Sequence, residues 1–185
     1  MLGKKIQLQR GVDITKDEQE SGDIPVVSSG GVSSYHNQAT CKGPGVVVGR
    51  KGTAGKLHYI ESDFWAHDTT LYVKEYNGND IRYVYYKLIS MKLEDYDTGS
   101  ANPTLNRNIV HPEKVSWPPL DEQKGIVKYL DEFCDLEGEM TKKIEQAITL
   151  LRERRTALIS AAVTGKIDVR NWVASVPENN EAAVA

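Results

Sequence analysis

The pattern of apolar and polar positions changes once along the chain, near residue 120. Before that point, short runs rich in β-branched residues at 25–27, 46–48, 57–60 and 69–73 alternate with glycine-containing turns. Such runs, bounded by turn residues, predict β-strands joined by tight connections. We therefore expect a β-rich domain in this first part of the chain.

One helix is predicted within that domain. Asp80 is a residue type that favours helix N-caps, and the apolar positions after it follow the i, i+3, i+4, i+7, i+8 spacing of one helix face. These positions are Ile81, Val84, Tyr85, Leu88 and Ile89. The expected fold class is therefore α+β, with residues 1–120 forming a globular domain of mixed structure.

A long helix is predicted to follow. Pro118 and Pro119 end the first domain, and Asp121 and Glu122 place negative charge in the first helical turn, where the helix dipole favours it. From there apolar residues recur at alternating steps of four and three, which is the heptad spacing of a coiled coil. This seam comprises Ile126, Leu130, Phe133, Met140, Ile144, Ala147, Leu151, Leu158 and Ala161, and Glu137 and Arg154 are its polar members.

The length of this helix indicates what must cover its apolar seam. Residues 121–162 would form a rod of roughly 60 Å, and Gly165 is a fitting stop. A domain of 120 residues is too small to cover such a stripe, so we expect a partner helix, although a helix folded back on its own domain is the alternative. The expected segments are a domain at 1–120, a coiled-coil helix at 121–165, a helix-end segment at 166–173 and a disordered tail at 174–185.

Composition narrows the class of protein. With 39% hydrophobic and 26% charged residues, the 185-residue chain has the composition of a soluble globular protein. It contains no apolar run long enough to span a membrane, and its N-terminus lacks the apolar core of a signal peptide. Cys41 and Cys134 are expected to be reduced thiols. They and the four histidines show no paired ligand spacing, so no structural metal site is predicted.

Net charge leaves nucleic-acid binding open. The formal charge is −3, and residues 1–120 carry 14 basic and 14 acidic side chains. A protein that binds DNA through overall charge would be basic. Any DNA binding must therefore depend on local groups of cations.

The segment 49–56, with the sequence GRKGTAGK, is such a local group. Its position after the apolar run 46–48 suggests a P-loop, which requires G-x-x-x-x-G-K-S/T and a helix that begins at the phosphates. Arg50 stands where the first glycine belongs, Leu57 replaces the hydroxyl residue, and a strand is predicted to follow. We reject a nucleotide site, and the cations Arg50, Lys51 and Lys56 need another explanation.

No catalytic group is predicted. The segment 102–105, with the sequence NPTL, lacks the second proline and the aromatic ring of the element with which amino-methyltransferases hold a base. His67 and Asp68 could form a base and its orienting group, but neighbouring residues on a strand point to opposite faces, so a structural pair is the expected interpretation. No set of acidic residues with a lysine suggests a nuclease.

Polar, glycine-rich loops offer a binding function instead. Glycine lets backbone amides approach phosphates, lysine and arginine neutralise phosphates, and polar side chains contact base edges. The first candidates for DNA contacts are Arg50, Lys51 and Lys56, and the second group comprises Ser29, Gly30, Tyr35, His36, Ser100 and Asn102. For each of them, a turn residue that serves only the fold is the alternative.

Several segments together resemble the Type I restriction–modification specificity subunits. They are residues 24–31, 49–56, 65–70, 118–123, 151–155 and 158–170, and the resemblance covers about residues 5–172. It implies a non-catalytic subunit whose target recognition domain binds one half of a bipartite, asymmetric DNA site. The long helix would pack antiparallel against a second such helix, act as a spacer and dock modification subunits.

The resemblance also places the cofactors on other chains. S-adenosylmethionine would be used by the modification subunits, which methylate adenine at N6. ATP and Mg²⁺ would likewise be used only by partner subunits, among them a motor-nuclease subunit that joins them for restriction. A prokaryotic, cytoplasmic location follows from the same resemblance.

The size of the chain departs from that family. Full members have two recognition domains and two long helices, whereas this chain has one of each. A natural half-length subunit, a truncation and a fragment are all compatible with the sequence. We expect a homodimer through the 121–162 helix that binds a two-fold symmetric site. A coiled-coil interaction or regulatory protein without DNA binding is the alternative.

Overall fold

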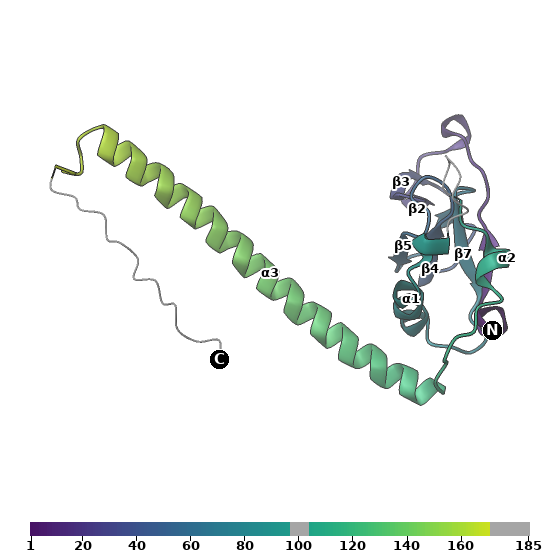
Figure 1. The fold of residues 1–185 in the computed structure, drawn as a ribbon. Helices are drawn as coiled ribbons and strands as arrows, with labels where there is room; N and C mark the ends of the chain where they lie inside the picture. Colours follow the sequence, from purple (N-terminus) through teal and green to yellow (C-terminus); the bar gives the residue numbers. More distant parts are fainter. Residues whose placement is uncertain (97–103, 171–185) are drawn as a thin grey trace, which may run out of the picture. The chain divides into compact units, whose positions relative to one another are not determined.

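The computed structural model describes residues 1–96 and 104–170, and the chain divides into two compact units, Met1–Glu132 and Phe133–Ala185 (Figure 1). The strands of the first unit are β1 (Gln7–Arg10), β2 (Ile24–Ser28), β3 (Gly31–His36), β4 (Gly45–Gly49), β5 (Leu57–Ile60), β6 (Trp65–Ala66) and β7 (Thr70–Glu75). Its helical elements are η1 (Leu2–Lys4), η2 (Lys16–Glu18), α1 (Ile81–Ser90), η3 (Leu93–Tyr96), α2 (Arg107–Val110) and the start of α3 (Leu120–Val163).

The strands form two sheets. The larger sheet has the order β1-β7-β4-β5 with all pairs antiparallel, and the smaller has the order β3-β2-β6, in which β2 and β6 are parallel. With these sheets and the long C-terminal helix, the predicted α+β fold class is confirmed. The described residues include no helix with the length and apolar character needed to cross a membrane.

The burial of β4 on both faces explains why its sequence is an unbroken apolar run. Val46 and Val48 lie in a core cluster with residues of α1, whereas Val47 lies in a second cluster with Val27 of the smaller sheet. All five β4 residues are buried. A strand that is covered on both faces needs apolar side chains at successive positions, because neither face meets water.

The predicted helix at 81–89 is confirmed as α1. The Asp80 side chain accepts a hydrogen bond from the Tyr83 backbone N–H at 2.9 Å, which satisfies one of the free donors at the helix start. Val84 and Leu88 are fully buried against the larger sheet's core cluster. The cap and the apolar face that the sequence indicates therefore act together.

A buried amide joins the start of α3 to the rest of the first unit. The Gln123 side chain is 1% exposed. Its Nε2 donates to Asn79 Oδ1 and to the Pro118 carbonyl, both at 2.9 Å, and its Oε1 accepts from the Asp80 N–H at 3.0 Å. Trp117 Nε1 donates to the same Asn79 oxygen at 2.6 Å. Every polar hydrogen and the oxygen of the Gln123 amide are thus paired, as burial requires.

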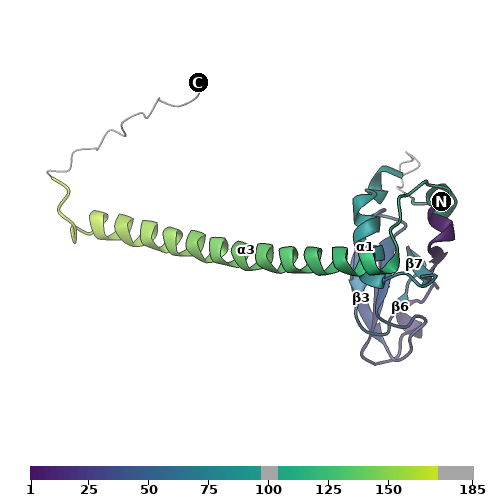
Figure 2. The same ribbon diagram turned by 90° about the horizontal axis from the view of Figure 1, so that it is seen from below.

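A second contact lies two turns further along α3, where Figure 2 shows α1 beside this part of the helix. Arg82 Nε donates to Asp131 Oδ1 at 3.0 Å, and the Tyr86 hydroxyl donates to the same oxygen. Burial first, and then the bond to Asp131, raises the pKa of Tyr86 to about 12. The Arg82 guanidinium also lies over the Tyr59 ring at 4.6 Å. These contacts extend the compact unit to Glu132.

In the second unit, α3 continues to Val163 and ends as expected. Gly165 has a φ of +73°, and the Lys166 N–H returns to the Ala161 carbonyl at 2.8 Å. A glycine in this left-handed conformation closes a helix without steric cost. The predicted stop is therefore confirmed.

We expect Gln123→Glu to lower the free energy of unfolding by about 3 kcal/mol, because a buried carboxylate would face the Asn79 and Pro118 oxygens without a donor. Urea unfolding followed by tryptophan fluorescence measures this loss. The same change at exposed Gln146 of α3 is the control and should cost almost nothing. The loss should shrink in acid, where a protonated carboxyl can again donate. Equal stability of both variants would refute the role of this amide.

Candidate nucleic-acid interface

The shape of the loop after β4 explains why glycines occur in it. The Gly49 N–H donates to the Lys56 carbonyl at 2.7 Å, and the Gly55 N–H donates to the Gly49 carbonyl at 2.9 Å, so the loop closes on itself. Gly52 and Gly55 have φ values of +81° and +84°. A Cβ on Gly55 would lie 2.2 Å from the Glu94 backbone nitrogen. Strand β5 follows the loop, as predicted, whereas a P-loop would open into a helix.

Thr69 joins this loop to the turn between β2 and β3. Its carbonyl accepts from the N–H groups of Arg50 and Lys51 at 2.8 and 3.1 Å, and its Oγ1 accepts from the Ser29 N–H at 3.3 Å. Lys56 Nζ donates to the Gly30 carbonyl at 3.3 Å. Five of the nine predicted DNA-contact residues, namely Ser29, Gly30, Arg50, Lys51 and Lys56, therefore lie in one place.

These residues differ in exposure. Lys51, Lys56 and Gly30 are exposed, and Ser29 is half-buried. The Arg50 side chain, in contrast, is only 13% exposed, and its Nε donates to the Asp68 carbonyl at 3.0 Å. Lys51 and Lys56 can thus reach a ligand on the surface, whereas Arg50 is held by its neighbours.

Tyr35 and His36 lie elsewhere. They are at the end of β3 that pairs with Ile24 and Pro25, whereas Ser29 lies in the turn at the opposite end of this hairpin. His36 is buried, accepts a hydrogen bond from the Glu20 N–H at 3.0 Å and forms a T-shaped ring contact with Trp65. Tyr35 is exposed. Ser100 and Asn102 lie outside the described residues, and the roles of all nine residues stay predictions.

His67 and Asp68 correct one premise of the sequence interpretation. They lie at the turn between β6 and β7 rather than within a strand, so their side chains do meet, with His67 Nδ1 3.2 Å from Asp68 Oδ1. Asp13 approaches the other imidazole nitrogen at 3.3 Å. The three groups could hold a metal ion by distance alone. Because Asp68 also pairs with two arginines, a further cation there would be repelled, and ion pairing accounts for the cluster.

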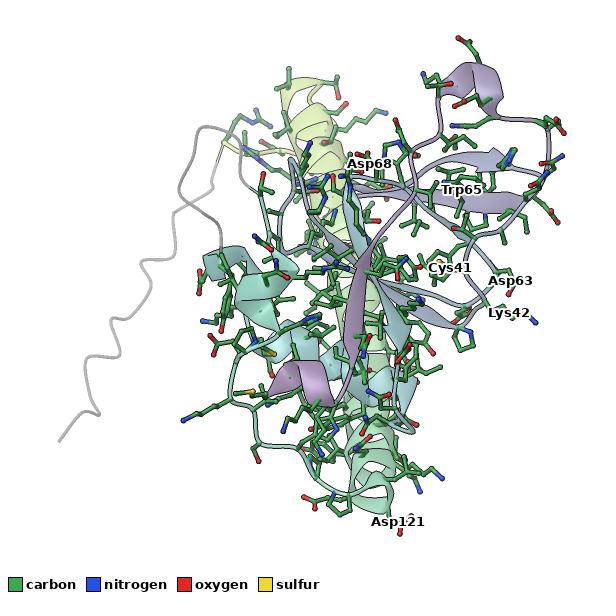
Figure 3. The ribbon with its side chains drawn as sticks, turned by 90° about the vertical axis from the view of Figure 1, so that its right-hand side faces the viewer. Cys41, Lys42, Asp63, Trp65, Asp68 and Asp121 are labelled. Carbon is green, nitrogen blue, oxygen red and sulfur yellow. The ribbon has the colours of Figure 1, made fainter. Side chains whose placement is uncertain are left out.

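Those two arginines are Arg10 and Arg50. Arg10 Nη2 lies 2.6 Å from Asp68 Oδ2, and Arg50 Nη2 lies 3.7 Å from the same oxygen. Burial raises the pKa of Asp68, but the hydrogen bond from Arg10 and the nearby positive charges outweigh it and lower that pKa below its usual value. Figure 3 shows Asp68 with its side chain among the surrounding sticks. The carboxylate is therefore ionised at neutral pH.

A cavity of about 260 Å³ beside this pair brings in residues that the sequence interpretation missed. It is lined by Arg10, Arg50, Leu71, Thr104, Leu105, Asn106 and Arg107. Arg10 and Arg50 are 40 positions apart and Arg107 is farther still, but β1 and β4 both pair with β7, and Lys51 bridges to Thr104. No local pattern signals such a group, because it exists only through strand pairing.

The helix seam divides between the two units. Ile126 and Leu130 are half-buried in the first unit. The five large members of the second unit (Phe133, Met140, Ile144, Leu151 and Leu158) are 50–62% exposed, and Ala147 is exposed as well. Leu136 and Leu150 extend this apolar stripe on one side. The prediction that a partner helix covers the stripe remains open.

Known proteins that resemble this chain include Type I restriction–modification specificity subunits. Residues 5–150 match the family described as Type I restriction modification DNA specificity domain. The Type I restriction enzyme EcoprrI specificity subunit of Escherichia coli is 24% identical over 147 residues, which is 76% of this chain and 37% of that protein. A putative type I specificity subunit of Mycoplasma pneumoniae is 28% identical over 145 residues, 74% of this chain and 40% of its own.

Solved structures share the fold. A structure described as showing complex assembly and conformational transition of the type I R-M system matches with a TM-score of 0.73 and 14% identity, over 87% of this chain and 44% of that one. The S subunit of a Type I restriction-modification system from M. genitalium matches with a TM-score of 0.64 and 16% identity, over 72% and 38%. The chain thus spans about two fifths of the length of these relatives.

Glycines of the candidate interface offer a matched pair of substitutions. We expect Gly55→Ala to lower the free energy of unfolding by about 3 kcal/mol, because its φ is positive and its Cβ would collide with the backbone at Glu94. Gly30→Ala should change stability by less than about 0.5 kcal/mol, because nothing lies within 4 Å of its Cβ and its φ is not in the left-handed range. Thermal unfolding measures both, and the opposite order would disprove this account of the loop.

Proposed function

Because this chain belongs to the family of Type I restriction–modification DNA specificity domains, we propose that it is a DNA-recognition subunit that directs partner subunits to their target. The family match over residues 5–150 carries the proposal. The first unit would bind one half of a bipartite site in double-stranded DNA. Methylation of adenine N6 and restriction would be carried out by the modification and motor-nuclease subunits.

The geometry of the interface supports DNA binding by the first unit. Lys51 and Lys56 are exposed cations on a loop whose shape is set by its own hydrogen bonds, and Gly30 presents exposed backbone beside them. A preformed loop of this kind loses little entropy on binding. Lysines contact phosphates without regard to sequence, so they would position the domain while other side chains contact base edges.

The chain itself would carry out no catalysis. S-adenosylmethionine, ATP and Mg²⁺ belong to the partner subunits in this proposal. Among the described residues, Asp13, His67 and Asp68 form the cluster that could hold a metal ion by distance, and its Asp68 is already paired with Arg10 and Arg50. Its groups serve the fold of the interface, where the His67–Asp68 turn also presents Thr69.

Pairing through the long helix would bring in a second copy of the chain, whose recognition domain would bind the second half of the DNA site. Its apolar stripe is exposed from Phe133 onward, and Leu136 and Leu150 make it wider than the seam of a two-stranded coiled coil. Antiparallel pairing of two copies would cover the seam and leave the flank for modification subunits. Two identical recognition domains would then bind a two-fold symmetric target, in a prokaryotic cytoplasm.

A coiled-coil interaction protein without DNA binding is the second candidate, because the exposed stripe alone would also suit it. Such a protein would bind the partner subunits but leave DNA unmodified. DNA modification in cells separates the two candidates directly.

Expression of this chain with its modification subunit should produce N6-methyladenine in a bipartite motif whose two halves are related by two-fold symmetry. Genome-wide mapping of methylated adenine measures the motif, and cells that express the modification subunit alone are the control. A well-expressed complex that methylates no motif would reject DNA recognition. An asymmetric motif would reject the homodimer and retain the recognition function.

Self-association through α3 can be tested apart from DNA. We expect Ile144→Asp to shift the chain from dimer to monomer in sedimentation equilibrium, because a carboxylate at the seam would be buried without a partner. Gln146→Asp, which points away from the seam in the heptad, is the matched control and should leave the dimer intact. A wild-type chain that sediments as a monomer at tens of micromolar would contradict the dimer.

A further inference from the structure

Three arginines converge on one small cavity of the first unit. Arg10 extends from β1, Arg50 follows β4, and Arg107 begins α2, and all three line the cavity of about 260 Å³. Among the described residues, Asp68 is the only carboxylate that forms an ion pair with any of them. The cavity therefore has more positive than negative charge around it.

Arg50 is incompletely satisfied there. Its Nη2 is buried without a hydrogen-bond acceptor, because Asp68 Oδ2 at 3.7 Å is too far for a hydrogen bond. Buried donors in folded proteins nearly always have an acceptor, and a desolvated guanidinium without one favours an anion beside it. Burial, and after it the charge of Arg10, lowers the pKa of Arg50, whereas Asp68 opposes this effect.

A hydrogen bond to the backbone of β1 holds the Arg107 side chain at this cavity. Its Nη1 donates to the Leu8 carbonyl at 3.4 Å, and the Leu8 N–H donates to His111 Nε2 at 3.0 Å. The backbone of β1 thus anchors one side of the Arg107 guanidinium. No carboxylate of the described residues pairs with Arg107, so its charge remains available to a ligand.

We propose that this cavity binds a phosphate group, and that Asp68 is a resident carboxylate that competes with the phosphate for Arg10. Guanidinium groups match phosphate in planarity and in hydrogen-bonding geometry. The described side chains that line the cavity include no aromatic ring on which a base could stack. The assignment of the phosphate to a DNA backbone rests on the proposed function, and a soluble phosphate would use the same chemistry.

The proposal changes the role of Arg50. Its Nε is occupied by the Asp68 carbonyl, and its side chain lies beside the cavity rather than on the surface. Bidentate contact with guanine requires a guanidinium that reaches a base edge in the groove. Arg50 would instead hold a phosphate from within, next to exposed Lys51, so one DNA strand could contact both residues.

The test measures binding of a short DNA duplex to the chain in complex with its modification subunit, by fluorescence anisotropy at several salt concentrations. Arg10→Gln and Arg107→Gln should each weaken binding about tenfold and reduce the slope of log K against log salt by about one, as expected when a phosphate contact is lost. Arg10→Lys should restore part of the affinity. Buried Arg50 is left unchanged, because its substitution could disturb the fold.

Asp68→Asn is the distinctive variant. It keeps the side-chain shape but removes the competing charge, so binding should become severalfold tighter. Lys42→Gln is the matched control, because Lys42 is exposed on a separate loop beside Asp63, where Figure 3 labels both residues. Thermal unfolding of each variant checks that the fold is retained. The proposal is overturned if the arginine variants lose no more affinity than Lys42→Gln, or if Asp68→Asn weakens binding in a folded protein.

A second experiment distinguishes a DNA phosphate from a soluble phosphate. It also distinguishes failure of the phosphate site from failure of the proposed function. Pyrophosphate is titrated into the wild-type chain and into Arg10→Gln, and the unfolding temperature is followed. If no duplex binds but pyrophosphate stabilises only the wild type, DNA recognition fails and the phosphate site stands with a soluble ligand. If duplex binding is normal and neither the arginine variants nor pyrophosphate has an effect, recognition stands and the phosphate site is refuted.

Discussion

The burial of β4 on both faces is the constraint on which the first unit depends. Its valines are shared between two apolar clusters, so the strand cannot shift by one residue without placing Val47 in the wrong layer. Gly49, at its end, is equally constrained, because a Cβ there would lie 2.1 Å from the Thr53 carbonyl oxygen. The cationic loop therefore starts from a point that the core holds in place. This rigidity links packing in the interior to the arrangement of Lys51 and Lys56 at the surface.

Hydrogen bonds fix the positions of segments that apolar packing alone does not hold. Thr69 holds the loop to the β2–β3 turn, and Gln123 holds the start of α3 to Asn79 and Asp80. Both groups of bonds connect segments that are far apart in the sequence, and every partner except the exposed Lys51 is buried or half-buried. Buried hydrogen bonds of this kind add directional specificity that apolar contact lacks. In this chain they position the 49–56 loop at one place and the start of α3 at another.

The electrostatics of the interface follow from the same arrangement. Asp68 lies at a turn and collects Arg10, Arg50 and His67 around one carboxylate. The result is a pair of arginines that one carboxylate partly neutralises, in a chain whose net charge is −3. Net charge is therefore a poor guide to the local charge of this surface, because the attraction that an ion feels depends on charges within several ångströms.

What the sequence by itself determined is local. Helix α1 and its Asp80 cap, the strands around 46–48 and 57–60, the long helix and its Gly165 stop follow from periodicity and from residues whose backbone preferences act within a few positions. Tertiary structure alone decided which distant side chains meet. Arg10, Arg50 and Arg107 surround one cavity, and His67 contacts Asp68, because strand pairing and a turn bring them together. The convergence of the three arginines leaves no periodic trace in the sequence, since it depends on the register of strands that are tens of residues apart.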